Sequence, residues 1–216
     1  MINIDRFKQF IDTISNKNGR GTITPSQFNS VTEQALYAWT MNQLGNQKQY
    51  QPGNPLPQTN MELDQDSIDK LRHLKETRSI RVINGLMAIP DGVKTDVNND
   101  VMPKYWRRSR IMHKYDNNGT PVRRKIEVVK DTEWEGRLDS TIVPPTRKRA
   151  ICNFGAENIE IEPSSEIVLA TFTYIRNPKT PEWKYTTQNG RPVYDSQNST
   201  DLDAPDSAFN EIAMLV

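Results

Sequence analysis

The sequence of 216 residues has one cysteine, two histidines and no long apolar run. The single cysteine, Cys152, excludes an internal disulfide and a cysteine-based zinc site. Its apolar neighbours predict a buried small side chain in a strand rather than a reactive thiol. The longest apolar run, residues 167–172, is far shorter than the roughly 20 residues of a membrane-spanning helix. The opening MINIDRFKQF has no hydrophobic stretch of signal-peptide length, so we expect a protein made in the cytoplasm, without a membrane partner.

Polar side chains are abundant instead. Only 35% of the residues are hydrophobic, and asparagine and glutamine together number 30. The length allows one large domain or two small ones. So small an apolar fraction indicates extensive polar surface, loops, or an interface that forms only on assembly.

Charge is unevenly spread along the chain, although the net charge is only +1. Residues 1–90 carry 10 basic and 8 acidic side chains, residues 91–150 carry 14 and 9, and residues 151–216 carry 4 and 10. A basic middle and an acidic end can pair between copies of one chain, and head-to-tail pairing of this kind closes into rings. Two independently solvated surfaces would produce the same distribution.

Two amphipathic helices are predicted near the N-terminus. Apolar residues three and four apart predict the first over residues 4–15. Thr24 has the character of an N-cap, with Pro25 at the first helical position and Gln27 as its capping-box partner. This pattern predicts a second helix that continues to about residue 44. Residues 45–60 have three prolines, two glycines and no periodicity, which favours an arm that reaches a neighbouring copy.

Alternating apolar residues between residues 147 and 185 predict the central β-strands. Gly155-Ala156 and Pro163–Ser165 separate three such strands, and an antiparallel meander is the simplest interpretation. Trp183 and Tyr185 are expected to fold back over the meander.

Two Asn-Gly pairs predict hairpins. Asn118-Gly119 is expected to join strands over residues 107–115 and 121–129, and Asn189-Gly190 to join residues 183–187 and 192–194. The remaining patterns predict strands near residues 80–82 and 86–89 and short helices over residues 66–74, 131–139 and 206–216.

These elements predict an α+β fold with an N-terminal helical hairpin, a core of antiparallel β-sheet made of a meander and hairpins, and a short C-terminal helix. The expected divisions are residues 1–44 (helical hairpin), 45–65 (arm or linker), 66–205 (mixed antiparallel β domain with short helices) and 206–216 (C-terminal helix).

Patterns typical of catalysis or metal binding are weak. His73 and His113 have no adjacent nucleophile motif, so we expect both in packing or at the surface. Asp96, Asn98 and Asp100 begin like a calcium-binding loop, but its glycine and terminal glutamate are missing. We therefore expect no enzymatic activity, no metal and no cofactor.

A basic cluster is the one feature that suggests a ligand. The predicted strands place Arg108 and Arg110 on the face of Trp106, and Arg123 and Lys125 together on the partner strand. Such a patch suits a phosphate backbone bound without regard to sequence. Pairing with acidic residues across strands or on another copy is the alternative. The candidate DNA-facing or inter-subunit residues are Arg107, Arg108, Arg110, Arg123 and Lys125.

Candidate contacts between copies lie in the arm and at the C-terminal end, which stays apolar up to Val216. An exposed apolar end favours a partner. The candidate oligomer contacts are Tyr50, Leu56, Phe209, Ile212 and Leu215.

Four segments resemble a family of virion proteins in crAss-like and related short-tailed phages of Bacteroidetes. They are NKNGRGTITPSQFNSVTEQAL from residue 16, PKYWRRS from residue 103, TYIRNPKTPEWKY from residue 173 and STDLDAPDSAFNEIAML from residue 199. The resemblance implies a virion protein of the neck, a ring of twelve copies stacked between portal and tail around the DNA channel. The implied partners are the portal protein, other neck or tail proteins and, transiently, packaged double-stranded DNA. The family offers no catalytic residues.

Two alternatives stay open. The chain could occupy another virion position, such as a tail or fibre-docking protein, or it could be a sequence-nonspecific DNA-binding module that uses residues 104–125. A steep salt dependence of DNA binding by the monomer would favour the module, because neutralised phosphates release counterions.

Overall fold

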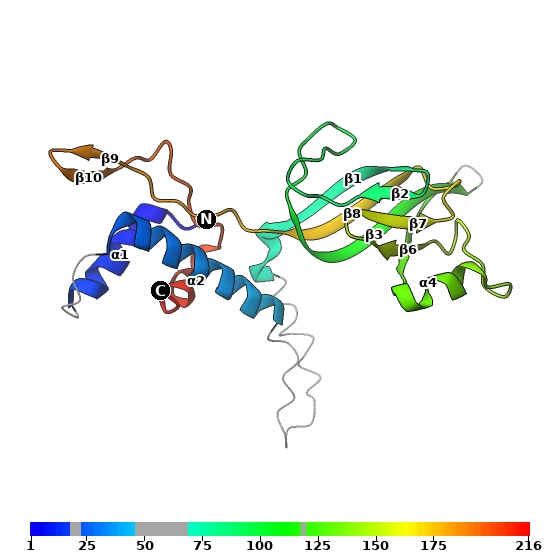
Figure 1. The fold of residues 1–216 in the computed structure, drawn as a ribbon, viewed down its shortest axis with the longest axis horizontal. Coiled ribbons are helices and arrows are strands. Elements are labelled where there is room, and N and C mark those ends of the chain that lie inside the picture. Colours follow the sequence, from blue (N-terminus) through cyan, green and yellow to red (C-terminus); the bar gives the residue numbers. More distant parts are fainter. Residues whose placement is uncertain (18–22, 46–68, 118–119) are drawn as a thin grey trace, which may run out of the picture. The chain divides into compact units, whose positions relative to one another are not determined.

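The computed structural model describes residues 1–17, 23–45, 69–117 and 120–216 and confirms an α+β fold (Figure 1). The chain divides into two units. The helical unit is formed by residues 1–74 and 178–216, and the barrel unit by residues 75–177, which are inserted between those two segments.

The helical unit contains the N- and C-terminal helices and one separate β-hairpin. Its described elements are α1 (Ile4–Lys17), α2 (Pro25–Gly45), the 3-10 helix η2 (Arg72–Leu74), β9 (Tyr185–Gln188), β10 (Arg191–Tyr194), the 3-10 helix η3 (Asp206–Ala208) and α5 (Phe209–Ala213). These bounds confirm the predicted helices near the N-terminus and the predicted hairpin at Asn189-Gly190.

The barrel unit contains eight strands in one sheet and a short helix. The elements are β1 (Lys75–Ile83), β2 (Leu86–Ala88), β3 (Tyr105–Asn117), β4 (Thr120–Lys125), β5 (Glu127–Val128), α4 (Asp131–Leu138), β6 (Ile151–Phe154), β7 (Asn158–Glu162) and β8 (Leu169–Arg176). The strand order is β4-β3-β8-β1-β2-β7-β6-β5. Only Ile126 separates β4 from β5, the two ends of this order, so the sheet closes on itself as a small barrel.

Buried apolar side chains from most strands of this sheet fill the barrel. Ile111, Ile126, Ile159 and Phe172 are each at most 1% exposed. Cys152 belongs to the same cluster, and burial raises the pKa of its thiol to about 12. The prediction of a buried small side chain is confirmed, and the thiol stays protonated at neutral pH.

The predicted three-stranded meander is wrong in its third strand. β6 and β7 pair as expected, but β8 lies between β1 and β3. β2 pairs with the edge of β7 that β8 would have needed. The β1–β2 hairpin therefore separates β7 from β8, and β8 pairs along most of its length with two longer strands.

The turn that places β2 is a two-residue hairpin at Asn84-Gly85. Both residues have positive φ, 51° and 78°, as the turn type compatible with strand twist requires. Asn189 and Gly190 have nearly the same angles, 50° and 75°, between β9 and β10. Asn118-Gly119 lies outside the described residues, although the flanking Asn117 and Thr120 pair as the predicted hairpin requires.

The start of α2 confirms the predicted capping box. The Gln27 backbone N–H donates to Thr24 Oγ1 over 3.4 Å, and the Thr24 backbone N–H donates to Gln27 Oε1 over 3.2 Å. Two otherwise unpaired donors of the first turn are thereby satisfied.

Trp183 joins the C-terminal segment to both N-terminal helices. Its indole N–H donates to Asp5 Oδ1 over 3.0 Å, and its backbone N–H donates to Asn29 Oδ1 over 2.8 Å. Tyr185 and Tyr194 stack on its ring. The expectation that Trp183 and Tyr185 cover the central strands is therefore wrong, and residues 178–205 belong to the helical unit rather than to the predicted β domain.

Candidate anion-binding cleft

A cleft opens where the chain leaves one strand neighbour and joins another. Lys125, the last residue of β4, still pairs with Met112 of β3, and the Ile126 N–H donates to the Ile111 carbonyl over 2.9 Å. One residue later the Glu127 N–H donates to the Ala150 carbonyl, beside β6. The fully buried Ile126 side chain anchors this switch in the barrel core.

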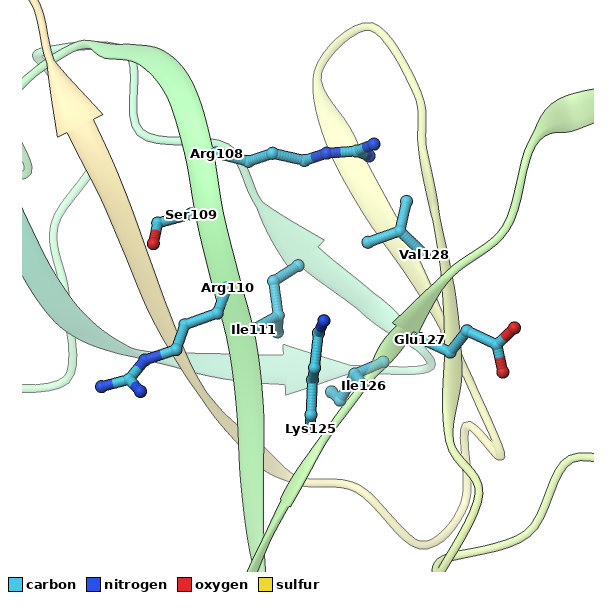
Figure 2. A pocket seen from close by; sticks show the side chains of 8 residues that line it. All are labelled: Arg108, Ser109, Arg110, Ile111, Lys125, Ile126, Glu127 and Val128. Carbon is cyan, nitrogen blue, oxygen red and sulfur yellow. The ribbon is translucent and has the colours of Figure 1, made fainter. Parts of the chain in front are cut away.

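The first part of β3 is left without a strand partner on that side, among the residues that the structure describes. Its pairing with β4 begins only at Met112, whereas its pairing with β8 extends back to Tyr105. The space between this free edge and residues 125–128 is a cleft of about 350 Å³. The lining residues, drawn in Figure 2, are Arg108, Ser109, Arg110, Ile111, Lys125, Ile126, Glu127 and Val128.

An irregularity in β3 separates the two arginines of the cleft. The register against β8 shifts between Arg108 and Arg110, which makes Ser109 an extra residue. Figure 2 shows that Arg108 extends toward Val128, whereas Ser109 and Arg110 point to the other side of the strand. The prediction that Arg108 and Arg110 share a face is wrong, because a regular period of two does not hold across this shift.

A second hollow of about 290 Å³ adjoins the first, since Lys125 and Glu127 line both. It adds three cations, Arg137 from α4 and Lys148 and Arg149 from the segment before β6. We call the two hollows together the basic cleft. Its basic side chains are Arg108, Arg110, Lys125, Arg137, Lys148 and Arg149, and its acidic side chain is Glu127.

The positive charge of the basic cleft is largely unneutralised. Glu127 forms an ion pair with Arg137 at 2.9 Å, and its side chain is 64% exposed. Within the described part of the chain, no carboxylate pairs with Arg110, Lys125 or Arg149. The one ion pair joins β5 to α4, so it is not the cross-strand pairing that the sequence left open, and it neutralises one cation of the six.

Arg108 is held in place by an aromatic ring. Its guanidinium carbon lies 5.1 Å from the centroid of Phe154, within the range of a cation–π contact. The contact restrains a long side chain without neutralising it, and an arginine stays charged at any physiological pH. The geometry thus offers a hydrogen-bonding cation at the edge of the cleft.

Three of the five predicted basic residues line the cleft, namely Arg108, Arg110 and Lys125. Arg107 and Arg123 do not. The sequence interpretation missed Arg137, Lys148 and Arg149. Residues 147–149 read Arg-Lys-Arg in the sequence, but nothing local indicates that this segment leads into a strand that pairs with β5.

The predicted oligomer contacts that the structure describes differ in how deeply they are buried. Ile212 is fully buried inside the helical unit, so the structure corrects its assignment as a contact between copies. Phe209 packs edge-on against Phe7 and Phe10, at centroid distances of 5.3 and 5.2 Å. Leu215 is 43% exposed and remains a candidate. Tyr50 and Leu56 lie outside the described residues.

The side chains considered for catalysis or calcium binding have structural roles. His113 is buried, and that burial lowers the pKa of its imidazole. His73 Nε2 lies 2.8 Å from the Asp203 carbonyl. Asp96 Oδ1 accepts the backbone N–H groups of Asn98 and Asp100, which closes a turn.

Metal and membrane sites are not found in the residues described. No group of three or more histidine, cysteine, aspartate or glutamate side chains is placed there to hold a metal ion. None of the described helices has the length and apolar character needed to cross a membrane.

No protein-family model matches the chain, and no curated protein is significantly similar to it.

Proposed function

We propose that this protein is a structural component of a phage virion that assembles with its own copies into a ring in the neck, between the portal and the tail. The position in the neck rests on the four segments that resemble neck proteins. The tendency to assemble rests on one observation, an apolar surface left exposed on the helical unit.

The exposed apolar surface comes from both ends of the chain. Tyr37 and Met41 on α2 are 49% and 46% exposed, although their helix is otherwise packed through Phe28, Leu36 and Trp39. The other members are Phe10, Ile14, Met214 and Leu215, which are 38%, 42%, 87% and 43% exposed. Phe10 packs against Phe209, the first residue of α5, and Leu215 follows two residues after the end of that helix.

A second copy of the chain suits this surface as the partner. Exposed apolar side chains gain free energy when they leave water, at about 25 cal/mol per Å². Large apolar side chains that a monomer leaves in solvent commonly mark an interface. A ring gives every copy two such contacts without leaving an open end.

Sedimentation velocity at rising protein concentration tests the assembly. We expect the wild-type protein to form a discrete larger species, and the double variant Ile14→Ser with Leu215→Ser to shift toward the monomer. The matched control, Ile142→Ser with Val168→Ser, removes exposed apolar side chains from the barrel unit and should assemble like wild type. Monomeric wild-type protein at all concentrations would contradict the proposal, as would equal loss in both variants.

A sequence-nonspecific DNA-binding module is the second candidate, favoured by the unneutralised basic cleft. The two proposals are compatible, since a neck ring surrounds the path of the DNA. Another virion position, in a tail or at a fibre, would keep the apolar contact between copies but would give the basic cleft no duplex to bind.

A further inference from the structure

We propose that the basic cleft binds the phosphate backbone of double-stranded DNA without reading its sequence. This inference rests on the proposed function for the source of the DNA, because a neck ring encloses a packaged duplex. It goes further by naming the surface and the side chains that make the contact.

The first argument is the charge of the cleft. Six basic residues line two adjoining hollows, although the side chain of one of them, Arg110, points to the other side of β3. The single carboxylate there, Glu127, is already paired with Arg137. Lysine and arginine side chains bind phosphate oxygens, and each neutralised phosphate releases condensed counterions. A cluster of unpaired cations at a concave surface therefore favours a chain of anions over one isolated anion.

The second argument concerns the alternative occupant of the basic cleft, which is the acidic segment of a neighbouring copy, residues 151–216. Three of the ten carboxylates in that segment already serve as internal acceptors. Asp201 accepts the Ile4 N–H over 3.0 Å, Asp203 accepts the Lys179 N–H over 3.1 Å, and Glu211 accepts the Trp39 indole N–H over 2.7 Å. Withdrawing them to pair with another copy would break contacts that hold the helical unit together.

The third argument favours a duplex over a single strand. Proteins that bind single strands stack the bases on exposed aromatic rings. The apolar side chains that line the first hollow are aliphatic, namely Ile111, Ile126 and Val128. The ring of Phe154 is covered by Arg108, whose guanidinium carbon lies 5.1 Å from its centroid. The cleft thus offers charge for a backbone and no platform for a base.

The test measures fluorescence anisotropy of a labelled duplex of about 20 base pairs at salt concentrations from about 50 to 200 mM. We expect the double variant Lys125→Ala with Arg149→Ala, two exposed cations that line the second hollow, to bind on the order of tenfold more weakly at low salt. The slope of log K against log salt should become shallower by about two, one for each lost phosphate contact. Two duplexes of unrelated sequence should give the same result.

The matched control is Lys75→Ala with Arg81→Ala, which removes the same net charge from exposed positions on β1. β1 is separated from β3 by β8, so these side chains do not line the cleft. The control should retain the wild-type salt slope. Because all four side chains are exposed, both variants should keep the wild-type circular dichroism spectrum.

Several results would overturn the inference. Equal loss in both double variants would mean that total charge, and not the cleft, attracts DNA. Tighter, cleft-dependent binding of a single strand would exclude the duplex. Loss of self-association without loss of DNA binding in the Lys125 and Arg149 variant would make the cleft a contact between copies.

The same proteins, examined by sedimentation velocity without DNA, separate this inference from the proposed function. Ring formation without cleft-dependent DNA binding contradicts only the inference. Cleft-dependent DNA binding by a protein that never assembles contradicts only the proposed ring.

Discussion

At the scale of single residues, Gly85 is the described glycine with the least room for a side chain. Its φ of 78° is unfavourable for any residue with a side chain, and a Cβ there would lie 2.7 Å from Ser164 Cβ. The Gly85 carbonyl also accepts the Ile161 N–H over 2.7 Å. One hydrogen atom in place of a side chain lets the β1–β2 turn approach the end of β7.

We predict that Gly85→Ala lowers the free energy of unfolding by about 3 kcal/mol, from backbone strain and steric overlap together. Gly190 is the matched control, because its φ is 75° and nothing lies within 4 Å of the added Cβ. Gly190→Ala should cost about 1 kcal/mol, the strain alone. Urea unfolding followed by circular dichroism measures both, and equal losses would show that the approach to Ser164 does not matter.

At the scale of elements, the ends of helices and the tight turns are specified locally. The capping box of α2 and the turn at Asn189-Gly190 were both predictable, because each depends on residues within three positions of one another. Asn84-Gly85 carries the same signal and would have predicted the β1–β2 hairpin.

We predict that Thr24→Ala destabilises the helical unit by about 1 kcal/mol, because the N–H of Gln27 loses its acceptor. Thr13→Ala is the control. Thr13 Oγ1 only donates to the Gln9 carbonyl within α1, so its loss should be neutral or slightly stabilising. Thermal unfolding compares the variants, and indistinguishable midpoints for the two would argue against the capping role.

Strand partners were not predictable in the same way. The position of β8 between β1 and β3, and the switch of the chain at Ile126, depend on pairings between residues far apart in sequence. A local pattern fixes which side chains alternate, but it does not fix which strand lies alongside. The basic cleft exists because of that switch, so the sequence predicted three of its cations and missed the other three.

At the scale of the whole molecule, the barrel unit has a core of its own. The cluster of buried apolar residues that includes Ile111, Ile159 and Phe172 lies entirely within residues 75–177. The helical unit, by contrast, needs both ends of the chain, which meet through Trp183 and Asp5 and through Trp39 and Glu211.

We predict that residues 75–177, expressed alone, fold cooperatively, because this continuous segment brings its complete core with it. The expected result is a single sharp transition in calorimetry and dispersed amide signals in NMR. A fragment that stays unfolded would mean that the barrel depends on the helical unit.

The role that we propose is architectural, with exposed apolar side chains of the helical unit for contact between copies and a basic barrel surface for DNA. Cryo-electron microscopy of purified particles of the phage that encodes this chain tests that role most directly. The predicted result is a closed ring of copies at the junction of head and tail, with Phe10 and Leu215 at the contacts between neighbours. Particles that lack the chain, or that hold it as isolated copies with those side chains in solvent, would contradict the account.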